Sequence, residues 1–387
     1  MTALGPLPAS ALPHGIRARH VACGNGLTMH VLEAGFEDRR RPCLLLLHGF
    51  PELAYSWRKV MLPLAAAGFH VVAPDQRGYG RTDGGDAFYD CELRQYFPLN
   101  LVRDALALVV ALGRLNVAAV IGHDFGSPVA VWCALARPDV FRKVVLMSAP
   151  FAGPPSFGLR HLPPDDPMRA YWDDPKRDIH RGLAALDPKR KHYQLYYTTR
   201  EADGDMRFCA QGIHDFLRAY YHHKSADWPG NRPFPLAAMS AEALAQLPTY
   251  YVMAADKTMA ETVAPEMPSP DAIAACRWLP DGELSVYSAE FARTGFQGGL
   301  NWYRARVEPE CDAELALFAG RTIDVPSCFI AGKSDWGTHQ KPGDFAMMQA
   351  SGCTQLLGCH LVEGAGHWVQ QEQPEAVSRL LLDFLRR

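Results

Sequence analysis

The sequence lacks any continuous apolar stretch of about 20 residues, the length that a membrane-spanning helix needs. It also lacks a dense run of Lys or Arg, since 39 basic and 42 acidic residues are mixed along the chain and give a formal net charge of −3. A protein without a positive patch has no electrostatic footprint for nucleic acid or anionic lipid. We therefore expect no nucleic-acid partner and no membrane, and instead a small neutral ligand.

Paired cysteines are missing as well. The ten cysteines include no Cys-x-x-Cys pair and no zinc-ligand spacing, so we expect ordinary buried thiols rather than a disulfide framework or a metal site. The first 20 residues are interrupted by Pro6, Pro8 and Pro13, which leaves no continuous apolar segment for a secretory signal. These absences favour a cytoplasmic protein that uses no metal and no cofactor. They leave the oligomeric state open, a homo-oligomer included.

What the chain does contain is an alternation of short apolar runs, such as "CLLLLHGF", "HVVAPD" and "KVVLMSAP", with longer helical patterns. This alternation predicts an α/β fold with a mostly parallel, doubly wound sheet. After Pro150 the sequence becomes rich in Pro, Tyr, Trp and His, and the strand-helix rhythm returns only with "VPSCFIAGKSD". We therefore predict a core of residues 24–150 and 323–387, an inserted lid of residues 151–322, and an N-terminal extension of residues 1–23.

The stretch "VIGHDFGSPVA" has the pattern glycine, any residue, nucleophile, any residue, glycine, with Asp124 at the nucleophile position. This pattern marks a strained turn between a strand and a helix that exposes one side chain at the edge of a sheet. Ser127 is placed to cap the following helix, and Pro128 is tolerated in a first helical turn. The alternative is an ordinary turn in which Asp124 only caps the helix.

A carboxylate at this position indicates which bond is attacked. Attack of Asp124 on an ester carbonyl would have to form an anhydride, a higher-energy acyl compound than the ester itself. Attack on a saturated carbon instead displaces an oxygen or a halide and leaves an alkyl ester on the enzyme, which water can then cleave. The second step requires an oxyanion hole and a base.

Three further stretches supply candidates for these roles. "HGFPE" follows an apolar strand, so the N–H groups of Phe50 and Phe125 could form the oxyanion hole. "GAGHW" places His367 in a glycine-rich turn late in the chain, where the base is expected. "CFIAGKSD" ends a strand with Asp335, the candidate acid that orients the histidine. A tight proline turn at "HGFPE" and a helix-capping Asp335 are the structural alternatives.

With these motifs in place, the sequence resembles the α/β-hydrolase fold epoxide hydrolases, the soluble type with an aspartate nucleophile. The motifs "HGFPE", "DQRGYGRT", "GHDFG", "GKSD" and "GHW" stand in the order of that family, and the resemblance covers the chain from about residue 25. It implies an α/β-hydrolase fold with an inserted, mainly helical lid. The implied activity is conversion of a small apolar epoxide to a vicinal diol through an ester of the aspartate, which His-activated water hydrolyses.

Two motifs in the lid make the resemblance more specific. "HYQLYY" and "GFQGGLNWYR" are similar to the segments that carry the two lid tyrosines of the family, which correspond here to Tyr193 and Tyr303. Their phenols would hold and partly protonate the epoxide oxygen as the ring opens. Tyr196 and Tyr197 are the alternatives in the first motif. The resemblance also suggests that Glu52 helps to hold the hydrolytic water, although a solvated or helix-starting Glu is an equal alternative.

Two other functions remain open. A haloalkane or haloacid dehalogenase shares the Asp nucleophile but needs a donor for the departing halide, and Phe125 offers none where the family often has tryptophan. A non-catalytic ligand-binding protein could share the fold. It would not need to keep a nucleophile, an acid, a base and two tyrosines. The lid also looks longer than is common in the family, so the shape of the substrate does not transfer.

Overall fold

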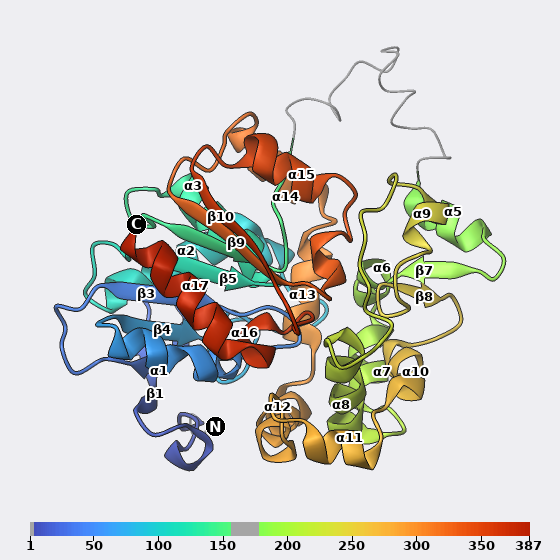
Figure 1. Ribbon diagram of the computed structural model, residues 1–387, viewed down its shortest axis with the longest axis horizontal. Coiled ribbons are helices and arrows are strands. Elements are labelled where there is room, and N and C mark those ends of the chain that lie inside the picture. The colour runs from blue at the N-terminus through green and yellow to red at the C-terminus, as the bar shows by residue number, and fades with distance from the viewer. Residues whose placement is uncertain (1–3, 156–177) are drawn as a thin grey trace.

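The computed structural model describes residues 4–155 and 178–387. The parts of the predicted extension and lid that fall in residues 1–3 and 156–177 lie outside the described residues. An eight-stranded sheet crosses the core in the order β1-β2-β4-β3-β5-β6-β9-β10, and all its pairs from β4 onward are parallel (Figure 1). The strands are β1 (Ile16–Ala22), β2 (Thr28–Ala34), β3 (Cys43–Leu47), β4 (His70–Pro74), β5 (Ala119–His123), β6 (Val144–Met147), β9 (Ser327–Gly332) and β10 (Leu356–Val362). The predicted mostly parallel sheet is thus confirmed.

The sheet begins earlier than the predicted boundary at residue 24. β1 pairs with β2 along its whole length in antiparallel register, so the last part of the segment expected as an extension belongs to the core sheet. β1 is an edge strand, and two of its polar side chains, Arg17 and Arg19, form ion pairs with Glu33 on β2. Polar residues interrupt the apolar residues of this strand, so it contains no apolar run by which the sequence could predict it.

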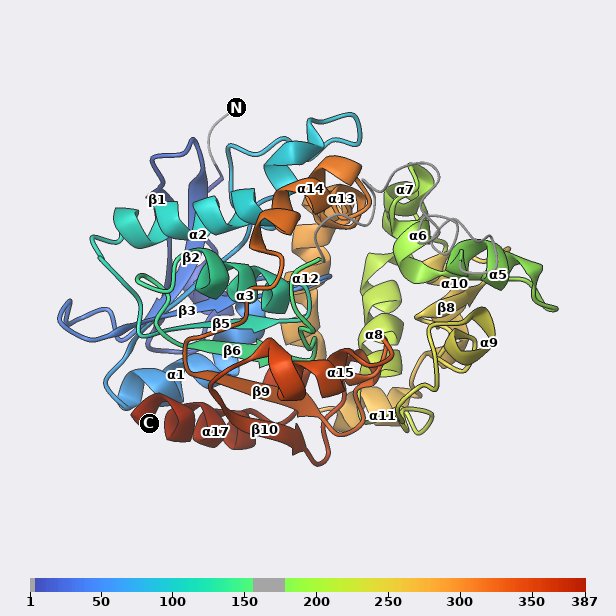
Figure 2. The ribbon, with the colours of Figure 1, turned by 90° about the horizontal axis from the view of Figure 1, so that it is seen from above.

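Helices cover both faces of the sheet, as the predicted doubly wound arrangement requires. α1 and α17 pack together on one face, and α2 and α3 pack together on the other (Figure 2). The central strands β3 and β5 are consequently buried at every residue, which explains their continuous apolar sequences. The core helices are α1 (Arg58–Ala66), α2 (Pro98–Ala111), α3 (Gly126–Ala136), α15 (Asp344–Met347), α16 (Val369–Glu372) and α17 (Pro374–Arg386).

The chain between β6 and β9 leaves the sheet and forms a separate, mainly helical layer beside it (Figure 1). Its described helices are α5 (Ile179–Ala185), α6 (Tyr193–Tyr197), α7 (Glu201–Arg207), α8 (Gly212–Lys224), α9 (Ala241–Leu244), α10 (Met259–Val263), α11 (Pro270–Ala275), α12 (Asp281–Thr294), α13 (Gln297–Ala305) and α14 (Pro309–Leu315). It also contains a two-stranded antiparallel sheet of β7 (Arg190–His192) and β8 (Val252–Ala254), which was not predicted.

Three predicted site residues follow three parallel strands of the core. Asp124 follows β5, Asp335 lies in the loop after β9, and His367 lies in the loop after β10. The carboxyl ends of parallel strands lie at the same edge of a sheet, where α/β proteins bind their ligands. The topology therefore brings these side chains to one edge.

Candidate active site

Asp124 occupies a strained turn at the end of β5. Its φ is +51°, in the left-handed region that residues other than glycine rarely adopt. The glycines on either side are required by close approaches of the backbone, since a Cβ on Gly122 would lie 2.0 Å from the carbonyl oxygen of Gly126. A Cβ on Gly126 would lie 2.2 Å from the carbonyl oxygen of Leu47. Strain of this kind costs roughly 1–3 kcal/mol and is typical of functional sites.

Helix α3 begins directly after this turn, but no side chain caps it. The residue at its N-cap is Phe125. The prediction that Ser127 caps the helix is wrong, because its hydroxyl donates to the carbonyl of Ala149 at 2.8 Å. Asp124 does not cap the helix either, so the ordinary-turn alternative finds no support in its contacts.

The side chains of Asp124, His367 and Asp335 lie in contact; those of His367 and Asp335 are buried, and that of Asp124 is 13% exposed. Nε2 of His367 is 3.2 Å from Oδ2 of Asp124, and Nδ1 of His367 is 3.1 Å from Oδ1 of Asp335. The same Oδ1 atom accepts the N–H of Gly337 at 2.7 Å, because Asp335 is the N-cap of a short 3-10 helix. Asp335 therefore both caps a helix, as in the structural alternative, and contacts the histidine. The capping bond fixes the carboxylate that faces the ring.

The electrostatic surroundings favour an ionised Asp124. Burial raises the pKa of this carboxyl, but the contact with His367 and the charges of His367 and Lys224 outweigh burial. Together they hold the pKa of Asp124 well below its usual range. A carboxylate is thus available at neutral pH, as a nucleophile must be.

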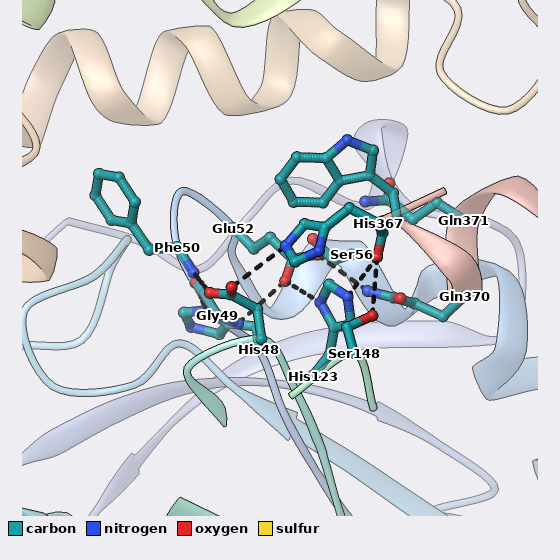
Figure 3. A network of polar contacts seen from close by, with 12 residues as sticks. His48, Gly49, Phe50, Glu52, Ser56, His123, Ser148, His367, Gln370 and Gln371 are labelled. Carbon is teal, nitrogen blue, oxygen red and sulfur yellow. Dashed lines mark hydrogen bonds and ion pairs between the residues drawn. The ribbon is translucent and has the colours of Figure 1, made fainter. Parts of the chain in front are cut away.

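The loop after β3 faces Asp124 closely. The N–H of Phe50 donates to Oδ1 of Asp124 at 2.9 Å, which places one predicted oxyanion-hole donor directly on this carboxylate (Figure 3). Gly49 has no room for a side chain, since a Cβ there would lie 2.3 Å from the same oxygen. Phe125, which carries the second predicted donor, follows Asp124 at the start of α3.

Glu52 is buried below the histidine, so the solvated alternative is wrong. Its carboxylate accepts the N–H of Gly49 at 3.1 Å and the amide of Gln370 at 3.0 Å, and contacts Nδ1 of His123 at 2.6 Å. The other ring nitrogen of His123 lies 2.7 Å from the carbonyl oxygen of His367 (Figure 3). Glu52 therefore reaches His367 through His123. Burial lowers the pKa of His123, but the charge and hydrogen bond of Glu52, together with the charge of Asp124 and the bond to His367, outweigh burial and raise it.

The two predicted lid tyrosines face each other across the site. Tyr193 begins α6 and Tyr303 lies in α13, with their ring centroids 6.0 Å apart. The ring of Tyr303 is 5.0 Å from that of Phe125, and Gln194 donates to the Tyr193 hydroxyl at 3.1 Å. Burial raises the pKa of both phenols well above the usual value, and the negative charge of Asp124 adds to the effect. Both phenols therefore stay protonated at neutral pH.

The two alternative tyrosines of the first lid motif have other contacts. The Tyr196 hydroxyl donates to Asp205 at 2.9 Å, and the Tyr197 hydroxyl donates to that of Tyr220 at 3.3 Å. For Tyr193, in contrast, the negative charge of Asp124 is one of the causes that raise the pKa of the phenol. The geometry thus favours Tyr193 in this motif.

Lys224 and Tyr251 also belong to these surroundings, and the sequence reading missed them. Lys224 is only 3% exposed, and its Nζ lies 5.2 Å from the ring centroid of Tyr251 and 5.4 Å from that of Trp368. The ring of Tyr251 packs 5.2 Å from that of Tyr193. Within the described residues, the Tyr251 hydroxyl has no hydrogen-bond partner. A lysine usually lies in solvent, so only the dense aromatic composition of the lid hinted at a buried cation here.

The described part of the chain offers neither a metal-binding cluster nor a membrane-spanning helix. Residues 4–155 and 178–387 contain no group of three or more His, Cys, Asp or Glu residues that could hold a metal ion. Over the same ranges, every helix is too short or too polar to cross a membrane.

An interrupted parallel sheet with a strained nucleophile turn, followed by an acid and a histidine, defines a hydrolase of the α/β class. The family model described as alpha/beta hydrolase fold matches residues 42–266, and the chain belongs to this family. Epoxide hydrolase B of Mycobacterium tuberculosis is 34% identical over 365 residues, which cover 93% of this chain and 96% of that protein. Epoxide hydrolase A of the same organism is 34% identical over 368 residues, or 93% of this chain and 95% of that protein.

Solved structures agree with these relatives. An epoxide hydrolase from an endophytic Streptomyces superposes with a TM-score of 0.75 at 31% identity, covering 97% of this chain and 96% of that chain. Potato (Solanum tuberosum) epoxide hydrolase I gives a TM-score of 0.70 at 29% identity, covering 96% of this chain and 99% of that chain. The chain is a member of the epoxide hydrolases of the α/β-hydrolase fold, which act on ether bonds. The family resemblance noted in the sequence is thereby confirmed.

Proposed function

We propose that this epoxide hydrolase forms its diol in two steps through an ester of Asp124. The observation that carries the proposal is the position of the Asp124 carboxylate, which lies between the N–H of Phe50 and Nε2 of His367. The charge of this carboxylate raises the pKa of two protonated phenols, those of Tyr193 and Tyr303. A nucleophile, a base and two acids are thus gathered around one position.

In the first step, a carboxylate oxygen of Asp124 attacks one carbon of the epoxide ring. The new C–O bond forms as the ring C–O bond breaks, and negative charge develops on the ring oxygen. The phenols of Tyr193 and Tyr303 donate hydrogen bonds to this oxygen and supply its proton. Both phenols come from the lid, whereas Asp124 comes from the core, so the first step needs the two layers together.

In the second step, His367 removes a proton from water, and the hydroxide attacks the carbonyl carbon of the Asp124 ester. The N–H of Phe50, with that of Phe125 as the second proposed donor, stabilises the resulting oxyanion. As this intermediate collapses, the bond to the alkyl oxygen breaks and that oxygen takes the proton held by His367, which releases the diol. The proton left on the Asp124 carboxyl returns to the phenolate, which restores the carboxylate and the phenols. Asp335 stabilises the protonated ring of His367, because its Oδ1 lies against Nδ1.

The proposed contribution of Glu52 to holding the water is indirect. The carboxylate of Glu52 contacts His123, which in turn contacts the carbonyl of His367. We propose that these two buried contacts fix the backbone of His367 on the side of the core. The water would then be held by His367 itself.

We propose a small apolar epoxide as the substrate and residues 151–322 as the lid that encloses it. Aromatic rings support both proposals, because Tyr303 is in edge contact with Tyr197 at 5.0 Å and with Phe50 at 5.6 Å between centroids. Rings of this kind favour binding of the apolar part of a substrate, while the phenol oxygens remain available to the epoxide oxygen.

A cytoplasmic location is supported by the cysteines. All ten lie in the described residues, and each is a free thiol there. Proteins of oxidising compartments often carry disulfides. We therefore propose a reducing compartment, and assay of the protein in cell fractions would test this.

A panel of epoxides and haloalkanes of matched carbon skeletons tests the proposed activity. We expect diol formation from epoxides to exceed halide release, because Phe125 offers no hydrogen-bond donor to a leaving halide. The variant Asp124→Asn should lose both reactions. Halide release comparable to diol formation would instead place the chain with dehalogenases in function.

A further inference from the structure

The loop that carries His367 is attached to the lid as well as to the core. The N–H of His367 donates to the carbonyl of Lys224, the last residue of α8, at 2.9 Å. The indole N–H of the next residue, Trp368, donates to the carbonyl of Tyr221 on the same helix at 2.8 Å. The backbone of the base is therefore bonded to a lid helix that lies across from the end of β10 (Figure 1).

Glu372, the last residue of α16, joins the two layers at this point. One of its carboxylate oxygens accepts the N–H of Ala226 at 2.8 Å and that of Gly366 at 2.9 Å. The other oxygen accepts the N–H of Trp368 at 2.9 Å. Two of these three donors flank His367 in sequence, and the third belongs to the lid segment just after α8.

The two backbones approach too closely here for any side chain between them. A Cβ on Gly366 would lie 2.5 Å from the nitrogen of Ala226 and 2.5 Å from the carbonyl carbon of Ser225. Only a glycine permits this contact, and the carboxylate of Glu372 bridges it. We refer to Glu372, Gly366 and the segment 224–226 as the lid–base clamp.

The clamp and Asp335 fix different parts of the histidine. Asp335 contacts Nδ1 and so sets the rotation of the ring, whereas the clamp sets where the backbone of His367 lies. General-base catalysis is sensitive to both, because a displacement of about 1 Å at a catalytic group can cost a hundredfold in rate.

We infer that Glu372 is a positioning residue, which docks the His367 loop onto the lid and so makes the base competent only while the lid segment 224–226 is in place. The inference rests on the proposed function of His367 as the base. It adds that the lid contributes to ester hydrolysis through the backbone of the base, besides contributing two phenols to ring opening.

This arrangement predicts an effect on one step of the reaction. Ring opening depends on Asp124, which is held by β5 and Phe50, and on the phenols of α6 and α13. Of the clamp, only Lys224 acts on these groups, through the charge of its side chain on Asp124, whereas the clamp contact of this residue is made by its backbone carbonyl. Loss of the clamp should therefore slow hydrolysis of the Asp124 ester more than its formation.

The variant Glu372→Gln tests this, because an amide has one acceptor oxygen and would turn its NH₂ toward one of the three donors. Burial raises the pKa of Glu372 to about 8, so the comparison is made at a pH of about 9, where Glu372 is the carboxylate that accepts all three bonds. The matched control is Glu375→Gln, since Glu375 is exposed in the first turn of α17. The rates of ester formation and ester hydrolysis are measured in single turnovers with an aryl epoxide. Samples are quenched at successive times, and the mass of the protein is determined by mass spectrometry.

In Glu372→Gln we expect ester hydrolysis to fall by about tenfold or more and ester formation by less than about threefold, so that alkylated Asp124 accumulates. Glu375→Gln should match the wild type in both. Equal losses in the two steps, or no loss in hydrolysis, would overturn the inference.

Hydrogen exchange of the amides supplies a readout that needs no turnover. In Glu372→Gln, the peptides containing 224–228 and 364–368 should lose protection together while the peptide of β5 does not. If the wild type formed no ester, the proposed function would fail, and exchange alone would decide the clamp. Unchanged protection of both peptides, or global loss of protection, would refute it.

Discussion

Oδ2 of Asp124 and Nε2 of His367 lie 3.2 Å apart at the edge of the sheet, where the lid meets the core. This contact lowers the pKa of the carboxyl and places the imidazole beside the carbonyl carbon of any ester that Asp124 forms. In the proposed mechanism, this one pair of residues serves both half-reactions. The predictions below separate its two partners and the groups around them.

Replacing the base should stop the reaction halfway. In His367→Gln, Asp124 still has the N–H of Phe50 and the lid phenols, so the ester should form. Its hydrolysis should slow by about 10²–10⁴-fold, because no group removes the proton from water. Mass spectrometry after incubation with an epoxide should show one added substrate on the peptide that contains Asp124. An unmodified peptide would argue against the assignment.

The rate of ring opening should be nearly independent of pH from about 5 to 10. Asp124 must be ionised, and its pKa is held well below the usual range, so it stays ionised as the pH falls to 5. The phenols must be protonated, and the pKa values of Tyr193 and Tyr303 are raised, so they stay protonated as the pH rises to 10. Single-turnover alkylation across this range tests the point. A midpoint inside it would show that another group controls the step.

The two lid phenols should stabilise the same developing negative charge together. Tyr193→Phe or Tyr303→Phe should each slow ring opening about 10- to 100-fold, since one phenol still stabilises part of the developing charge. The double variant should be close to inactive. Stability should fall by only about 1 kcal/mol per hydroxyl removed, which thermal unfolding would show. Full activity of both single variants would remove the tyrosines from the mechanism.

Lys224 should influence the nucleophile through its charge. In Lys224→Met the apolar side chain fits among the surrounding rings, and the pKa of Asp124 should rise because a nearby cation is gone. Alkylation at low pH should then fall relative to alkylation at pH 8, while the wild type shows no such change. Lys257→Met, at an exposed lysine of the lid, is the control. Identical pH profiles would show that the charge of Lys224 has no part in the reaction.

The sequence located those groups that follow strands at the edge of the sheet. Asp124 and His367 stand in glycine-rich turns, and Asp335 ends an apolar run, so short local patterns were enough to find them. The parallel core was readable for the same reason, because its strands are buried on both faces and consist of apolar residues.

Groups that depend on packing between distant segments escaped this reading. β1 is a polar edge strand that only its partner defines, and the hydroxyl of Ser127 bonds to the carbonyl of Ala149 rather than to its own helix. Lys224 and Glu372 look like solvated side chains in sequence, since Lys224 becomes buried and Glu372 partly buried only when the lid packs on the core. Their contacts with Trp368 and Gly366 could not be deduced from spacing.

The most direct measurement is a single turnover in heavy-oxygen water with enzyme in excess over a purified epoxide. If Asp124 is the nucleophile, its ester is cleaved at the carbonyl carbon. One heavy oxygen should then appear in the peptide containing Asp124, and the first diol released should be unlabelled. Heavy oxygen in the diol and none in that peptide would mean that water opens the ring directly, which would contradict the ester mechanism.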